Sequence, residues 1–122
     1  MFELGSKVKN ILIVTSDYYE NVSKGLIKGS TDFIKHQNII HEQLKINYEI
    51  KKAPGAFEVP YLINQYKNSY DAFLAFGCII RGETYHFEVI ANEVTRKIMD
   101  LSININKPIG FGILTCENLD QA

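Results

Sequence analysis

The sequence has few cysteines and no excess of charge of either sign, and each deficit excludes a class of protein. Cys78 lies inside one apolar run and Cys116 at the end of another, so the two make no disulfide framework of the kind that staples small secreted domains. Thirteen basic and fourteen acidic residues leave a net charge of −1, with no basic surplus to neutralise nucleic-acid phosphates. We therefore expect buried cysteines in a reducing compartment and no nucleic-acid partner.

Long hydrophobic runs and metal-ligand spacing are also missing. The longest apolar run, Ala72 to Ile80, is far shorter than the roughly 20 residues that span a bilayer, and Met1-Phe2-Glu3 is not a signal-peptide start. His36, His41 and His86 show no metal-ligand spacing to one another or to the cysteines. The sequence thus predicts a cytoplasmic protein with no membrane partner and no metal.

What is present is the composition of a soluble globular protein. The chain has 122 residues, of which 46% are hydrophobic and 22% charged. A chain of this length buries about two-thirds of its unfolded surface on folding, enough for one modest core. We expect a single α/β domain over residues 1–122.

Four segments have the apolar runs or the alternation of β-strands. They are Asn10–Thr15, Ile46–Lys52, Ala72–Ile80 and Pro108–Thr115. The first, third and fourth are near-continuous apolar runs, which is the pattern of strands covered on both faces of a parallel sheet.

Three segments between these strands carry apolar residues at helical spacing. The positions are Val22, Leu26, Gly29 and Phe33, then Val59, Leu62, Ile63 and Tyr66, then Ile90, Val94, Ile98 and Leu101. Ser16 and Asp17 are the candidate caps of the first helix. The alternation predicts a flavodoxin-like, three-layer α/β/α fold with a four-stranded parallel sheet. Lys35–Lys45 is expected to be a polar connection and residues 1–9 a loose arm.

The sequence predicts too few helices to cover both faces of the sheet. Asp120-Gln121-Ala122 stands about one turn into the expected fourth helix, so the final helix is truncated in the sequence given. Three helices cannot cover both faces of four apolar strands. We expect further residues and neighbouring subunits to supply the missing cover.

Ligands of open α/β sheets bind beyond the carboxyl ends of the strands, so the chemistry is expected in the loops found there. The third loop is the most informative, because Gly82 leaves a strand and Thr84 opens a helix. That arrangement suits one phosphate, with His86 beside it to transfer a proton near neutral pH. A plainer account stays open, in which Thr84 only caps the helix and His86 is a half-buried surface residue.

The other loops allow the same two interpretations. Tyr18 could stack on a flat heterocycle or only hold the start of a helix. Gly55 permits close approach of backbone to a ligand, and Glu58 could accept hydrogen bonds from hydroxyls or serve as a helix N-terminal carboxylate. His36 and His41 lie away from the strand ends. No glycine-rich dinucleotide motif or phosphate-binding P-loop occurs.

Three motifs occur in order along the chain: PGAFEVP at Pro54–Pro60, GCIIRGETYHFE at Gly77–Glu88 and GILTCENLDQA at Gly112–Ala122. Together they resemble the lumazine synthase family of riboflavin biosynthesis, and the resemblance runs from about Asn10 to the last residue. It implies condensation of 5-amino-6-(D-ribitylamino)uracil with 3,4-dihydroxy-2-butanone 4-phosphate to 6,7-dimethyl-8-ribityllumazine, without metal or organic cofactor.

The resemblance also implies roles for individual residues, with His86 as the proton-transfer group. The remaining residues are Tyr18 stacked on the pyrimidine, Ala56, Phe57 and Glu58 on the ribityl chain and pyrimidine edge, Cys78, Ile79 and Ile80 offering backbone to the ring, and Glu83 and Thr84 at the phosphate. Phe111 would reach the pocket of an adjacent subunit, in a homo-oligomer built on pentamers.

Two departures from the family pattern leave alternatives open. The basic residue that pairs with the substrate phosphate in the family, and a further lysine, fall beyond Ala122. Tyr19 stands where many relatives have a smaller polar residue. The second hypothesis is therefore a non-catalytic shell or carrier that holds a lumazine or flavin, and a third is a flavodoxin-like flavin carrier.

Overall fold

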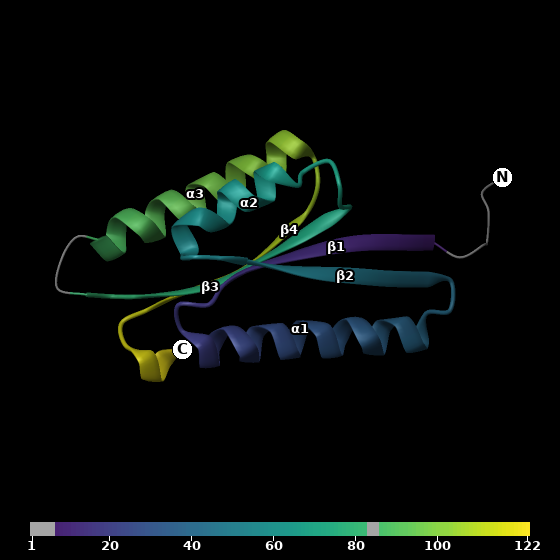
Figure 1. Cartoon of the computed structure of the whole chain (residues 1–122), viewed down its shortest axis with the longest axis horizontal. Helices are drawn as coiled ribbons and strands as arrows, with labels where there is room; N and C mark the ends of the chain where they lie inside the picture. Colours follow the sequence, from purple (N-terminus) through teal and green to yellow (C-terminus); the bar gives the residue numbers. More distant parts are fainter. Residues whose placement is uncertain (1–6, 83–85) are drawn as a thin grey trace.

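The computed structural model describes residues 7–82 and 86–122, which form a three-layer α/β/α arrangement. Its single parallel sheet contains β1 (Lys7–Ser16), β2 (Leu44–Ala53), β3 (Ala72–Ile80) and β4 (Ile109–Cys116) in the spatial order β2-β1-β3-β4. The helices are α1 (Glu20–Ile40), α2 (Val59–Gln65) and α3 (His86–Ile105), with short 3₁₀ turns η1 (Ala56–Glu58) and η2 (Leu119–Gln121). Figure 1 shows α1 on one face of the sheet and α2 and α3 on the other. The α/β class predicted from the sequence is confirmed.

The strand order places a topological switch between β1 and β3. From β1 the chain passes to β2 on one side, and then crosses back to β3 on the other side of β1. Loops leaving β1 and β3 therefore diverge, which opens a crevice at the carboxyl ends of these two strands.

Among the residues that the structure describes, no helix combines the length and apolarity needed to cross a membrane.

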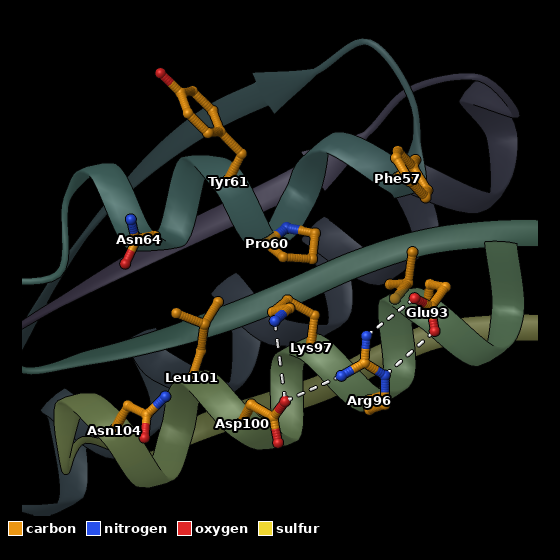
Figure 2. A pocket seen from close by; sticks show the side chains of 11 residues that line it. Phe57, Pro60, Tyr61, Asn64, Glu93, Arg96, Lys97, Asp100, Leu101 and Asn104 are labelled. Carbon is orange, nitrogen blue, oxygen red and sulfur yellow. Dashed lines mark hydrogen bonds and ion pairs between the residues drawn. The ribbon is translucent and has the colours of Figure 1, made fainter.

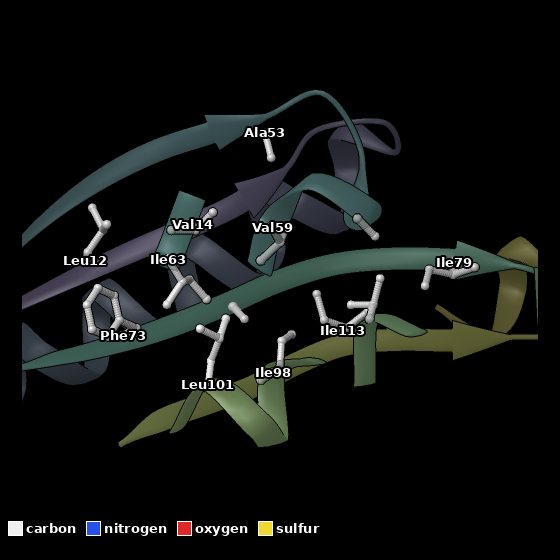
Figure 3. Close-up of a cluster of buried hydrophobic side chains, with 13 residues drawn as sticks. Leu12, Val14, Ala53, Val59, Ile63, Phe73, Ile79, Ile98, Leu101 and Ile113 are labelled. Carbon is white, nitrogen blue, oxygen red and sulfur yellow. The ribbon is translucent and has the colours of Figure 1, made fainter. Parts of the chain in front are cut away.

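The main hydrophobic cluster lies between the sheet and the α2/α3 layer (Figure 3). Leu12 and Val14 of β1 and Phe73 of β3 meet Ile63 of α2 and Ile98 of α3 in this cluster. The predicted apolar faces of α2 and α3 are confirmed, since Val59, Ile63, Val94, Ile98 and Leu101 are buried. Burial of these side chains is the main favourable contribution to folding.

The predicted apolar face of α1 is wrong in its second half. Gly29 is exposed and Phe33 is 63% exposed, whereas Ser23, Thr31 and Ile34 are buried. The two polar residues are tolerated because Ser23 exchanges a 2.9 Å hydrogen bond with Thr15 and Thr31 donates to the carbonyl of Ile27. An apolar-spacing rule cannot detect a buried face made in part from hydroxyl side chains.

Three boundary expectations are also wrong. Ser16 and Asp17, the predicted caps of the first helix, do not cap it, because Ser16 is the last residue of β1 and the N-cap of α1 is Tyr19. Tyr19 makes no side-chain capping bond. The expected polar connection over Lys35–Lys45 is short, because α1 continues to Ile40 and β2 starts at Leu44. The amide of Asn38 explains the tight junction, since it donates to the carbonyl of Ile46 (2.9 Å) and accepts from its N–H (2.7 Å). The expected loose arm is a strand from Lys7, and residues 1–6 lie outside the described part.

Close packing between β3 and β4 depends on a glycine at position 112. A Cβ added there would lie 2.6 Å from Cδ1 of Phe76, a buried ring on the neighbouring strand. We expect Gly112→Ala to destabilise the fold by about 1–3 kcal/mol, because the ring must leave its rotamer or the strands must separate. Urea unfolding followed by circular dichroism measures the change.

Gly29→Ala is the matched control for this prediction. Position 29 lies within α1, and an added Cβ has no neighbour within 4 Å among the described residues. The alanine should stabilise the protein by about 0.5–1 kcal/mol through the better helix propensity. Equal effects of the two substitutions would contradict the packing account.

Candidate active site

A cavity of about 570 Å³ opens at the carboxyl edge of the sheet, where β1 and β3 diverge. This volume is within the range of small-molecule sites. The described residues that line it come from four segments: Ser16, Tyr18 and Tyr19; Gly55, Ala56, Phe57 and Glu58; Cys78, Ile79 and Ile80; His86, Val89 and Ile90. Segments far apart in sequence thus meet where the loop analysis expects a ligand.

Two tyrosines form one wall of the cavity. The rings of Tyr18 and Tyr19 meet edge to face, with centroids 5.0 Å apart and an interplanar angle of 69°. Tyr18 is 75% exposed, so its ring face is open to a flat ligand. Burial, followed by the neighbouring Tyr18 and Cys78, raises the pKa of Tyr19, so its hydroxyl stays a neutral donor at pH 7.

Asp17 fixes the loop that carries these tyrosines. Its carboxylate accepts a 2.7 Å hydrogen bond from the Ser23 hydroxyl and pairs with the ammonium of Lys52 at 2.9 Å. The hydrogen bond from Ser23, and then that from Lys52, lower the pKa of Asp17. The β1–α1 loop is thereby tied both to α1 and to the end of β2.

This arrangement predicts an acid-side stability difference for Asp17→Asn. Because folding lowers the pKa of Asp17 below its ordinary value of 3.8, the carboxylate stabilises the fold fully above that pH. The stabilisation is lost as the pH falls through the folded-state pKa. In urea unfolding, Asp17→Asn should therefore be less stable than the parent at pH 7, and the difference should shrink as the pH falls below 3.8. The difference should shrink in a Lys52→Met background; a constant gap at every pH would contradict it.

In the segment Gly55–Glu58, the carboxylate of Glu58 lies over Gly55. A Cβ on Gly55 would lie 3.2 Å from Oε1 of Glu58, so the missing side chain lets this carboxylate fold back over the loop. Ala56 is buried, whereas Phe57 is 54% exposed and lines both this cavity and a second one between α2 and α3. This segment offers backbone groups, an apolar surface and one acceptor for hydroxyl or N–H groups.

The end of β3 supplies a buried, largely apolar floor. Cys78 and Ile79 are each 7% exposed, and burial, then interaction with Cys116, raises the pKa of the Cys78 thiol. A thiol with a raised pKa is a poor nucleophile at neutral pH. The chemistry of the site therefore has to come from proton transfer and positioning rather than from attack by sulfur.

His86, the first residue of α3, lines the same cavity as Tyr18 and Glu58. An imidazole can both take and give a proton near neutral pH. Glu83 and Thr84, predicted to hold a phosphate, lie outside the described residues. His36 and His41 lie near the carboxyl end of α1 and are not among the residues that line the cavity.

Two further findings complete the comparison with the sequence prediction. Phe111 lies on the edge strand β4, is 49% exposed, and is not among the described residues that line the cavity of its own chain. Ser16, Val89 and Ile90 line the cavity although the sequence prediction assigned them no ligand contact. Tyr19, where many relatives have a smaller polar residue, lines it too. The helical spacing of Ile90 with the buried residues Val94 and Ile98 was the one signal available for it, whereas Val89 is 52% exposed and lies off that face of α3.

A second cavity of about 490 Å³ lies between α2 and α3 (Figure 2). The charged side chains that line it form ion pairs with one another: Arg96 pairs with Glu93 at 2.9 Å and with Asp100 at 3.5 Å. No histidine occurs among the described residues that line it. Because proton transfer near neutral pH is the usual task of an imidazole, the cavity beside His86 is the better candidate for catalysis.

Comparison with known proteins points to one family. A family model described as 6,7-dimethyl-8-ribityllumazine synthase matches residues 8–122. The chain is 42% identical over 119 residues to the 6,7-dimethyl-8-ribityllumazine synthase of Bartonella tribocorum, covering 95% of this chain and 74% of that protein. It is 39% identical over 114 residues to the protein of the same name from Kosmotoga olearia, covering 92% of this chain and 70% of that protein.

Proposed function

The chain belongs to the 6,7-dimethyl-8-ribityllumazine synthase family, and from this premise we propose how the cavity beside His86 carries out the family reaction. The protein is a transferase of riboflavin biosynthesis. It condenses 5-amino-6-(D-ribitylamino)uracil with 3,4-dihydroxy-2-butanone 4-phosphate to 6,7-dimethyl-8-ribityllumazine, with release of phosphate and water. A non-catalytic flavin or lumazine carrier is not favoured.

The observation that carries the proposed mechanism is the meeting of His86, Tyr18 and Glu58 in one cavity. An aromatic amine attacks a ketone and water leaves as an imine forms. Phosphate is then eliminated, and the resulting enol becomes a ketone. The second amine attacks this new carbonyl, and loss of a second water closes the ring. Each of these steps moves protons, and none requires a covalent intermediate with the protein. The cavity matches this demand, because it combines an imidazole with surfaces that orient two small molecules.

Each group in the cavity has a role that suits its chemistry. His86 transfers protons to and from the amine, ketone and leaving groups. Tyr18 stacks on the pyrimidine, while the segment Ala56, Phe57 and Glu58 holds the ribityl chain and the pyrimidine edge. The side chains of Cys78, Ile79 and Ile80 are apolar or buried, so the polar groups that this segment can offer to the pyrimidine ring are those of its backbone. The role of Glu83 and Thr84 at the phosphate stays a prediction.

The active site is proposed to lie at an interface between subunits. Phe111 is a half-exposed aromatic residue on the edge strand β4, and this exposure supports its proposed role in the cavity of a neighbouring subunit. We expect a cytoplasmic homo-oligomer built on pentamers, and sedimentation of the protein tests its subunit number. A purely monomeric protein with full activity would contradict the shared site.

Turnover itself is tested by mixing the two substrates with the protein and recording the absorbance of the lumazine product. The account predicts product that accumulates in proportion to enzyme concentration, with phosphate released in equal amount. Stoichiometric flavin in the purified protein, together with no product, would instead support the carrier hypothesis.

A further inference from the structure

Arg81 joins three segments of the chain beside His86. Its Nε donates a 2.6 Å hydrogen bond to Oε2 of Glu117, and its Nη1 pairs with Oε1 of Glu88. Its backbone N–H donates to the carbonyl of Cys116 at 2.9 Å. One residue just past the end of β3 therefore contacts both the first turn of α3 and the segment that follows β4.

Arg81 holds the start of α3 by a second contact. The guanidinium lies over the ring of Phe87, 4.5 Å from the ring centroid, and Phe87 packs against the main hydrophobic cluster. The residues held, Phe87 and Glu88, directly follow His86 in the first turn of α3. Because α3 is a continuous helix, fixing these two residues fixes the position of the His86 backbone and the direction of its Cα–Cβ bond.

The charges indicate that Arg81 acts on the protein rather than on a substrate anion. One guanidinium faces two carboxylates, so the group of Arg81, Glu88 and Glu117 carries a net negative charge that repels a phosphate. The hydrogen bond with Arg81 lowers the pKa of Glu88, so this pair stays ionised across the neutral range. Exposed ion pairs stabilise a fold little, which leaves geometry as the contribution of Arg81.

We propose that Arg81 is a positioning residue: through Phe87, Glu88 and Glu117 it fixes the first turn of α3 and thereby the place of His86 in the cavity. The expected effect of Arg81 on turnover rests on the proposed function of His86. The expected effect of Arg81 on the position of His86 does not, because that position can be measured without substrate.

Arg81→Ala tests the proposal. We expect kcat to fall about 10–100-fold with little change in KM, because a displaced proton-transfer group slows chemistry more than binding. We expect the ring signals of His86 in the NMR spectrum of the protein to move or broaden. In a His86→Ala background the same substitution should lower kcat no further, since Arg81 acts through His86.

Arg96→Ala is the matched control, because Arg96 also pairs with two carboxylates, Glu93 and Asp100, and lies on α3, the helix that begins at His86. Its kcat and the His86 signals should stay as in the parent. Arg81→Lys keeps the charge but loses the fork and the stacking, so its kcat should fall between those of the parent and Arg81→Ala. If Arg81→Ala does not fold, Glu88→Gln, which removes one arm only, should still lower kcat and move the His86 signals.

Three results would overturn the proposal: unchanged His86 signals in folded Arg81→Ala, a loss no larger than that of Arg96→Ala, or a further loss of equal size in the His86→Ala background. Failure of the proposed function is distinguishable, because the parent protein would then form no lumazine. The His86 signals of the Arg81 and Arg96 variants would still decide whether Arg81 positions the imidazole.

Discussion

Replacing His86 by alanine should lower kcat by about 10²–10⁴-fold and leave a slow but measurable condensation. The loss is large because His86 begins α3 inside the cavity and is the histidine among the described residues that line it. The reaction survives because orientation of the two substrates by the remaining walls is unchanged, and positioning can supply up to roughly 7–11 kcal/mol of the barrier reduction. The measurement is steady-state formation of the lumazine chromophore.

His36→Ala is the control for this prediction. His36 is an exposed histidine on α1, outside the cavity, so its replacement should leave kcat as in the parent. A His86→Ala protein with the parent turnover rate would remove His86 from the mechanism. A protein with no turnover above the uncatalysed rate would show that positioning contributes less than proposed.

Replacing Phe73 by alanine should destabilise the fold by about 3–5 kcal/mol, the largest effect on stability that we expect from one substitution. Phe73 is 1% exposed within the main hydrophobic cluster (Figure 3). The centroid of its ring lies 6.2 Å from that of Tyr70, at an interplanar angle of 64°. Alanine would leave a cavity that Leu12, Ile63 and Leu101 cannot fill without moving. Urea unfolding at fixed protein concentration measures the difference, since self-association would otherwise contribute.

Phe33→Ala is the control, because it removes the same ring from an exposed position. Phe33 is 63% exposed on α1, so its loss should change the free energy of unfolding by no more than about 0.5 kcal/mol. A small effect at Phe73 together with a large one at Phe33 would contradict the placement of the core between the sheet and the α2/α3 layer.

The sheet was predictable because its strands repeat one simple signal. Each of β1, β3 and β4 carries a near-continuous apolar run, and such a run identifies a strand without reference to any partner. The buried faces of α2 and α3 were predictable for the same reason, since apolar residues alone define them. On α1 that condition fails, because Ser23 and Thr31 are buried with their hydroxyl groups hydrogen-bonded.

The candidate site was predictable only as far as local sequence reaches. The ends of the strands can be located in the sequence, which assigns Tyr18, Glu58 and His86 to one edge of the sheet. The structure shows that these three residues line one cavity. The contacts that organise the site could not be assigned, since they join residues distant in sequence. Arg81 and Glu117 are 36 positions apart, and no periodicity relates them.

A crystal structure with 5-amino-6-(D-ribitylamino)uracil bound tests the central claim most directly, because it distinguishes the cavity beside His86 from the cavity of similar size between α2 and α3. The account predicts the pyrimidine on the ring of Tyr18, its ribityl chain beside Glu58, and the imidazole of His86 facing the amino group. A pyrimidine seated instead between α2 and α3, against Arg96 and Asp100, would contradict the assignment of the active site.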